Sequence, residues 1–252
     1  MLMDALARPG NEYTGKDADH FIENTFNRIK SLNLKHTDVI IRGDSGFASP
    51  AFYEAVDRES FYFIVRLKAN ATLNRIAEET VTGIQVNPEQ NQTIYYETEY
   101  QAKSWPQPYR VLVQSEYHKG EMALWTHTFL VTNMLETNPQ TILAIYKKRG
   151  DAENKIKEQK SGFGFDKTDS STFVRNSARA LVSGVAYNLI QLFRALTMAD
   201  DKHVTIDTLR FQLFHTAGRV TKHARQTIIH LASNHVHREL FWRLVTSVQR
   251  LT

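Results

Sequence analysis

Four polar residues near the middle of the chain share one side of a predicted helix. They are Tyr146, Arg149, Glu153 and Lys160, at offsets of 0, 3, 7 and 14 residues. At 3.6 residues per turn these offsets fall within roughly 60° of arc, and Lys157 joins the same side. The guanidinium, ammonium and phenolic groups can bind phosphate oxygens, and the carboxylate can bind a divalent cation. A solvated helix face with one Arg149–Glu153 ion pair is the alternative interpretation.

A second acidic motif lies upstream, at the end of a predicted strand. Residues 38–43 form a mainly β-branched, apolar run, and Asp44-Ser45-Gly46-Phe47 follows it. An ordinary turn aspartate is one interpretation of Asp44. The other takes the two motifs together, because Glu153 lies 109 positions after Asp44. Asp-x-Gly-Phe followed at this distance by Tyr-x2-Arg-x3-Glu-x6-Lys resembles the DDE-type transposases of bacterial insertion sequences, specifically the group with a Tyr-Arg-Glu-Lys signature.

The resemblance implies a fold, an activity and roles for these residues. It implies a ribonuclease H-like core and DNA cleavage and strand transfer with two divalent ions, Mg²⁺ or alternatively Mn²⁺. Asp44 and Glu153 would be both the catalytic and the metal-binding carboxylates. Contacts with DNA would come from the other members of the helix side, Tyr146, Arg149, Lys157 and Lys160. The implied partners are the terminal inverted repeats of a mobile element, its target DNA and a second copy of the chain in a homodimer on DNA.

The resemblance also implies strands that precede the first helix. In this fold three antiparallel strands come first, and the first of them carries an aspartate. Only residues 1–7 have room for a strand before the helix predicted at 17–31, so we expect an N-terminally truncated copy without the first aspartate. Asp4 would lie on the wrong strand to replace it. Two alternatives stay open: a metal-dependent nuclease of the same fold, and a non-catalytic DNA-binding or regulatory remnant.

Composition is compatible with this interpretation but supports it only modestly. The chain has 252 residues, a formal charge of +4 and 42% hydrophobic residues, which indicates a folded globule with a mild preference for anionic partners. It contains no cysteine, which excludes disulfides and thiolate metal sites. Five histidines between 215 and 237 lack a compact metal-ligand spacing and are interpreted as surface residues of a basic tail. We expect a bacterial cytoplasmic protein with no membrane partner.

The pattern of apolar residues predicts an α/β fold with a mixed sheet. Four segments are expected: the first part of the core at 1–69, a β-rich insertion at 70–138, the second part of the core at 139–200 and a C-terminal extension at 201–252. Strands are predicted at 1–7, 38–43, 61–67, 93–100, 109–114 and 128–132, with a hairpin around 218–229. Helices are predicted at 17–31, 50–57, 139–160, 177–198, 204–214 and 237–251. The broad apolar side of the helix at 177–198 is expected to lie in the core.

Overall fold

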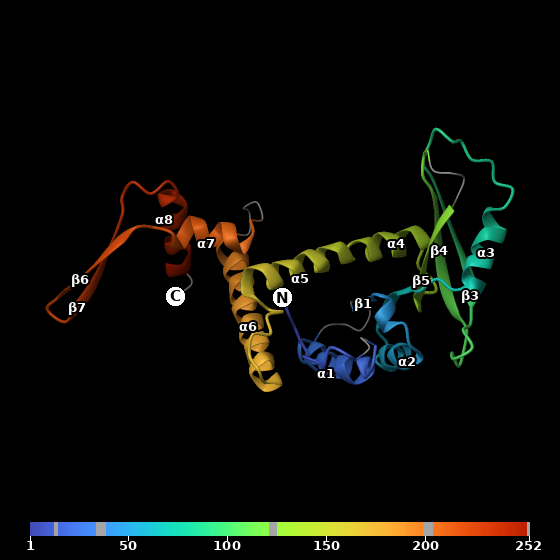
Figure 1. Cartoon of the computed structure of the whole chain (residues 1–252), viewed down its shortest axis with the longest axis horizontal. Coiled ribbons are helices and arrows are strands. Elements are labelled where there is room, and N and C mark those ends of the chain that lie inside the picture. Colours follow the sequence, from blue (N-terminus) through green and yellow to red (C-terminus); the bar gives the residue numbers. More distant parts are fainter. Residues whose placement is uncertain (13–14, 34–38, 121–124, 199–203, 251–252) are drawn as a thin grey trace. The chain divides into compact units, whose positions relative to one another are not determined.

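The computed structural model describes residues 1–12, 15–33, 39–120, 125–198 and 204–250 (Figure 1). The chain forms two compact units. We call Arg8–Asp151 the sheet unit, and Met1–Ala7 together with Ala152–Thr252 the helical unit. Each is described separately. Asp38 and Leu251, at the ends of two predicted elements, lie outside the described residues.

A mixed five-stranded sheet forms the centre of the sheet unit, in the order β1-β2-β5-β4-β3. Its strands are β1 (Ile40–Gly43), β2 (Tyr62–Leu67), β3 (Gln92–Tyr100), β4 (Tyr109–Tyr117) and β5 (Trp125–Thr132). β1 and β2 are parallel, and the other neighbours are antiparallel. The predicted α/β class with a mixed sheet is confirmed, and the architecture is consistent with the ribonuclease H-like transposase fold.

Helices cover both faces of this sheet because successive side chains of a strand point to opposite faces. On β2, Phe63 and Val65 belong to one buried cluster and Ile64 to another. The first cluster includes side chains from α1 (Ala18–Ser31), α2 (Pro50–Arg58) and α3 (Ala71–Val81). The second takes Ile142 and Leu143 from α4 (Pro139–Lys147). The strand positions therefore determine on which face each helix packs.

Local sequence signals account for two of these helices. The Ser49 hydroxyl accepts a hydrogen bond from the Phe52 N–H, and Pro50 occupies the first turn of α2, as the sequence predicts. The α3 helix was not predicted. The Asn70 side chain caps it by accepting from the Leu73 N–H, and Leu73, Ala77 and Val81 are buried at a helical spacing. The segment that follows β2 thus carries a helix before its strands begin.

The strands predicted between 70 and 138 are present, but they extend the sheet instead of packing beside it. β5 pairs with β2 on one side and with β4 on the other, so that Leu130 lies opposite both Arg66 and Leu112. These three strands are continuous with the strand that precedes Asp44. The division into core, insertion and C-terminal extension stays a prediction.

The helical unit contains α6 (Phe173–Thr197), α7 (Ile206–Phe214), α8 (Arg238–Gln249) and the hairpin of β6 (Gly218–His223) and β7 (Gln226–Leu231). Most of α5 (Arg149–Phe163) belongs to it, although the helix begins in the sheet unit. Its apolar core is formed by Ile206, Leu209, Leu213 and Leu244. The predicted helices and hairpin of the last fifty residues are confirmed, with small differences in their ends.

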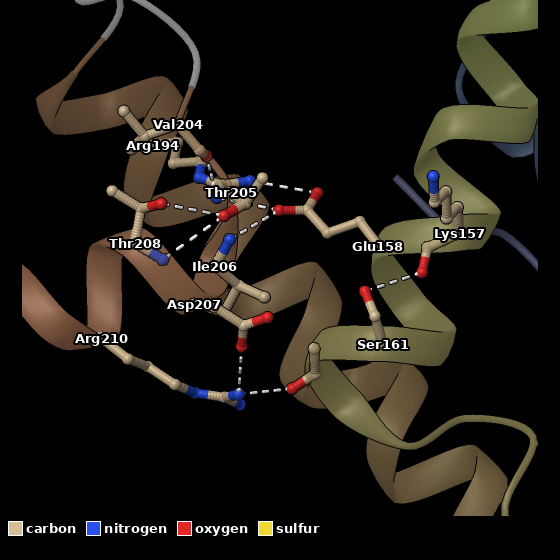
Figure 2. A network of polar contacts seen from close by, with 11 residues as sticks. Lys157, Glu158, Ser161, Arg194, Val204, Thr205, Ile206, Asp207, Thr208 and Arg210 are labelled. Atoms are coloured by element: carbon tan, nitrogen blue, oxygen red, sulfur yellow. Dashed lines mark hydrogen bonds and ion pairs between the residues drawn. The ribbon is translucent and has the colours of Figure 1, made fainter.

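A buried ion pair joins three helices of this unit (Figure 2). The Arg194 guanidinium on α6 donates to both carboxylate oxygens of Glu158 on α5, at 3.0 and 3.3 Å. Glu158 also accepts from the Ile206 N–H at the start of α7, at 2.9 Å. Both side chains are only 10% exposed. Because a buried charge needs a partner, this network fixes α5, α6 and α7 against one another.

The N-terminal strand prediction is wrong. Within residues 1–9 the structure contains neither strand nor helix. The backbone of Leu2 instead binds the side-chain amide of Asn188 on α6, which accepts from the Leu2 N–H and donates to the Leu2 carbonyl, both at 2.7 Å. Asp4 lies in this irregular segment, and its side-chain carboxylate accepts a hydrogen bond from the Ala5 N–H.

The expectation that the apolar side of α6 is core is also wrong. Its other side is the one that packs in the helical unit: Ser183 donates to the Phe163 carbonyl, and Tyr187 lies edge-on to the Phe163 ring. The apolar side remains 47–69% exposed at Leu181, Val182, Val185, Leu189, Leu192 and Leu196. By length and composition alone, α6 is long and apolar enough to cross a membrane. The core helices of many soluble proteins satisfy the same criterion, so this is weak evidence.

Candidate functional site

Asp44 lies at the carboxyl end of β1, as predicted. Its Oδ1 accepts a hydrogen bond from the Gly46 N–H at 2.9 Å and caps the 3-10 helix Ser45–Phe47. The preceding Gly43 is closely packed, because a Cβ there would lie 3.1 Å from a Phe47 side-chain atom and 3.3 Å from a Val65 side-chain atom, closer than most Cβ contacts. Close packing and the cap therefore fix the backbone that carries Asp44. Its side chain is 46% exposed and accessible to a ligand.

Two members of the predicted helix side contact the end of β1. The Arg149 Nη2 donates to Asp44 Oδ2 at 3.4 Å, and the Tyr146 hydroxyl donates to the Gly43 carbonyl at 3.4 Å. A third contact, from Arg42 on β1 to the Ile145 carbonyl at 2.8 Å, holds the end of α4 against the same strand. More than one hundred residues separate each pair along the chain. The acidic motif and the start of the Tyr-Arg-Glu-Lys motif therefore meet within the sheet unit.

The helix predicted at 139–160 is divided at Lys148. α4 ends at Lys147 and α5 begins at Arg149, and the Asp151 N–H donates to the Lys148 carbonyl three residues back. Such a bond is of the tighter 3-10 type and changes the direction in which side chains leave the helix. The uniform spacing assumed for Tyr146 and the residues after it therefore does not hold across this point.

A hollow of about 720 Å³ adjoins Asp44 in the sheet unit. Lys68 and Asn70, which follow β2, line it together with Tyr100 and Trp105 from the end of β3 and the loop beyond. Asn70 Nδ2 donates to the Tyr100 hydroxyl at 3.1 Å, and the rings of Tyr100 and Trp105 meet edge to face. Polar and aromatic groups thus surround a space beside the carboxylate. Sequence reasoning missed Lys68 and Asn70, whose only signal was their position just after a buried strand.

The other predicted residues lie together in the helical unit. Glu153, Lys157 and Lys160, all on α5, line a shallow hollow of about 500 Å³ with Ser161 and Asp166. The Lys160 Nζ is 4.0 Å from an oxygen of Asp166, an exposed pair that contributes little to stability. Asp166 was not predicted. It follows the left-handed Gly164, the glycine stop that ends α5 three residues later than expected.

The carboxylates have the chemistry that a hard divalent cation requires. Mg²⁺ binds one or two carboxylates and retains several waters. Asp44 keeps accepting capacity beyond its bonds to Gly46 and Arg149, because a carboxylate has about four lone-pair positions. Within the described part of the chain no three of His, Asp and Glu cluster closely enough to hold a metal. The expected approach of Asp44 and Glu153 stays a prediction.

Comparison with known proteins identifies the family. No curated protein matches the chain. The family model described as transposase DDE domain group 1 matches residues 1–252, the full length of the sequence. The match agrees with the mixed α/β architecture and with the acidic residue that directly follows β1. This chain therefore belongs to the DDE-domain transposases.

Proposed function

We propose that the chain is a transposase of the insertion-sequence type, which cleaves DNA at the ends of a mobile element and joins them to target DNA. Membership of the DDE family supports an activity of the endonuclease and strand-transfer kind. The observation that carries the proposal for this site is the contact of Arg149 and Tyr146 with the β1 end that bears Asp44. This contact brings the first two residues of the Tyr-Arg-Glu-Lys motif to the acidic motif, as a shared site requires.

Asp44 and Glu153 are the carboxylates that we assign to metal binding. Two divalent ions, Mg²⁺ or Mn²⁺, would activate the attacking oxygen and stabilise the leaving oxygen in this class of reaction. Asp44 is held on a strand end by the cap to Gly46, which limits its rotamers before any ion binds. Glu153 lies on a regular helix and shares a hollow with two lysines. Both are thus on rigid elements, as a metal site requires.

Phosphate binding is the role that we assign to the basic residues. Arg149 is placed to neutralise Asp44 in the free protein and to turn its planar fork to a phosphate when DNA arrives. Lys157 and Lys160 supply point charges in the hollow beside Glu153. Tyr146 contacts the end of β1 through its hydrogen bond to the Gly43 carbonyl, and its hydroxyl can instead donate to an oxygen of the DNA backbone. The DNA would be the terminal inverted repeats and the target, bound by a homodimer in the bacterial cytoplasm.

Metal binding tests the assignment without requiring turnover. Isothermal titration of the chain with Mn²⁺ should show binding that Asp44→Asn and Glu153→Gln each weaken. Asp166→Asn is the matched control, since Asp166 lines the same hollow as Glu153 but has no assigned metal role. Unchanged Mn²⁺ binding in both variants would contradict the assignment.

A second experiment separates transposition from the alternatives. Nicking of a plasmid that carries element ends, dependent on Mg²⁺ and abolished in the same two variants, is expected of a transposase. Nicking with no preference for the ends would favour a metal-dependent nuclease. Binding of the ends without Mn²⁺ binding would favour a non-catalytic regulatory protein.

A further inference from the structure

The positive charge of this protein is concentrated in one segment. Residues 208–238 contain five Lys and Arg, five His and no Asp or Glu. The rest of the chain holds 26 Lys and Arg against 27 Asp and Glu. The formal excess of +4 therefore comes entirely from a segment outside both sequence motifs. An acid-free stretch of this length is a candidate surface for a polyanion.

The β6–β7 hairpin is the centre of this segment. Six residues of each strand pair in register from Gly218↔Leu231 to His223↔Gln226. Ala224 and Arg225 make the two-residue turn, both with positive φ, which matches the twist of a tight hairpin. Figure 1 shows the hairpin projecting from α7 and α8 as a narrow ribbon. Every residue of β7, and all of β6 except Thr221, is exposed.

The two sides of the ribbon differ in chemistry. Residues paired across an antiparallel ladder share a side. One side carries Arg219 with His230, Thr221 with Ile228, and His223 with Gln226. The other side carries Val220 with Ile229, and Lys222 with Thr227. The ribbon thus has one predominantly basic and polar side.

The Lys and Arg side chains of the ribbon form no ion pairs with acidic residues in the part of the chain that the structure describes. Arg219, Lys222 and Arg225 form no ion pair with any acid in the described ranges, whereas Lys30, Arg75 and Lys119 of the sheet unit all do. The ribbon is almost entirely exposed, so it contributes little buried surface to the helical unit. An isolated two-stranded hairpin of this kind is only marginally stable in water, and a structural role therefore does not explain it. Uncommitted charge on a projecting element indicates a partner of opposite charge.

We propose that the β6–β7 hairpin, which is outside the Asp44 and Glu153 sequence motifs, is a second DNA-binding element and lies in the major groove of duplex DNA. A six-residue hairpin is about 20 Å long, and the major groove, about 12 Å wide, accepts a two-stranded ribbon. Arg219 and Gln226 are side chains that bind guanine and adenine edges, and Lys222 and Arg225 near the turn can contact phosphates. The inference rests on the proposed function in taking DNA as the polyanion.

The test removes the charge of the ribbon without altering its strands. In Arg219→Gln/Lys222→Gln/Arg225→Gln, the slope of log affinity against log salt for a fluorescent mixed-sequence duplex should fall by about 0.9 for each phosphate that the hairpin no longer neutralises. The matched control, Lys30→Gln/Arg75→Gln/Lys119→Gln, removes the same net charge from exposed ion pairs elsewhere and should leave the slope unchanged. Far-ultraviolet circular dichroism should be the same for all three proteins.

Two further measurements test the position of the hairpin in the major groove and, separately, the DNA-binding roles proposed for Arg149 and Lys160. Methylation of guanine N7, which lies in the major groove, should weaken binding by the unmodified protein and have no effect on the hairpin variant. An unchanged salt slope in the hairpin variant, equal effects of the two triple variants, or indifference to methylation would overturn the inference. Arg149→Ala/Lys160→Ala, measured in parallel, tests the proposed function separately. If this variant keeps the salt slope of the unmodified protein while the hairpin variant has a reduced slope, the phosphate-binding roles proposed for Arg149 and Lys160 are contradicted and the hairpin proposal stands.

Discussion

The Asp44–Arg149 pair is an interaction whose value for stability is small. The two side chains are 46% and 27% exposed and their closest atoms are 3.4 Å apart. Pairs in such a setting typically contribute between about 0 and 1 kcal/mol, because water screens them and ordering two side chains costs entropy. The position of Arg149 beside the Asp44 carboxylate is thus better explained by ligand binding, of phosphate by Arg149 and of a cation by Asp44, than by stability.

Substitution of Arg149 separates these roles. Arg149→Ala should change the free energy of unfolding by less than about 1 kcal/mol, and should lower the salt slope of DNA binding by about 0.9. Arg149→Lys keeps the charge but removes the planar fork, so it should retain the slope with weaker affinity. Urea unfolding and fluorescence anisotropy measure the two quantities. Arg75→Ala, which removes an exposed arginine paired with Glu79, is the control and should alter neither. A large loss of stability in Arg149→Ala would mean that the pair is structural.

Asp57 gives the stability of the sheet unit a predictable pH dependence. Burial raises the pKa of its carboxyl above the ordinary value, and the hydrogen bond from Asn133 opposes this shift. The folded state therefore binds the proton more tightly than the unfolded state, so this group makes stability fall as pH rises from about 4 through the raised pKa. Asp57→Asn keeps an acceptor for Asn133 and removes the charge. The variant should gain stability relative to the unmodified protein at pH 7 but not at pH 3, as measured by urea unfolding. A gain of equal size at both pH values would contradict the explanation.

At the scale of elements, α5 offers two glycines in opposite environments. A Cβ at Gly162 would overlap the side chain of Ile206, the first residue of α7, whereas a Cβ at Gly150 would meet nothing within 4 Å. Gly162→Ala should therefore destabilise the protein by about 1–3 kcal/mol through overpacking. Gly150→Ala should stabilise it by up to about 1 kcal/mol, since alanine favours a helix. Chemical denaturation measures both, and a stabilised Gly162→Ala protein would show that α7 does not pack closely there.

Elements with strong local signals could be predicted from the sequence. The proline and serine that start α2, the apolar run of β2 and the turn-bounded strands β3, β4 and β5 all formed where their patterns indicate. The failures have physical causes. The backbone of Leu2 is satisfied by Asn188, a partner 186 residues away, so no strand forms. α3 depends on three buried residues spaced four apart, and it lies in a segment that the overall texture of residues 70–138 assigned to strands.

The candidate site was only partly accessible to sequence reasoning, for a related reason. Helical spacing correctly grouped Glu153, Lys157 and Lys160, because all three lie on the uninterrupted part of α5. It could not show that Arg149 contacts Asp44, since that depends on the packing of α4 against the sheet and on the break at Lys148. Lys68 gave only the weak signal of its position just after a buried strand, and Asp166 gave none, because their places at these hollows depend on tertiary structure.

At the scale of the whole molecule, the exposed apolar side of α6 is the feature that most needs a cover. Six leucine and valine side chains between 181 and 196 are about half exposed or more. Monomeric proteins rarely expose a contiguous apolar surface of this kind, since burying each such side chain contributes about 1.5–3 kcal/mol. The homodimer proposed for DNA-bound transposase supplies one occupant, a second α6 packed against the first.

Self-association should accordingly depend on α6. The unmodified protein should show a concentration-dependent sedimentation coefficient, and Leu181→Glu/Leu189→Glu should remain monomeric over the same range, because two carboxylates buried between the helices would have to give up their hydration. Both positions are exposed, so the helical content should be unchanged by circular dichroism. Phe214→Glu, at a still more exposed residue on α7, is the control and should still associate. Loss of helical content in the double variant would contradict the exposure of Leu181 and Leu189. If the unmodified protein is monomeric at every concentration, with and without DNA, the homodimer proposal fails.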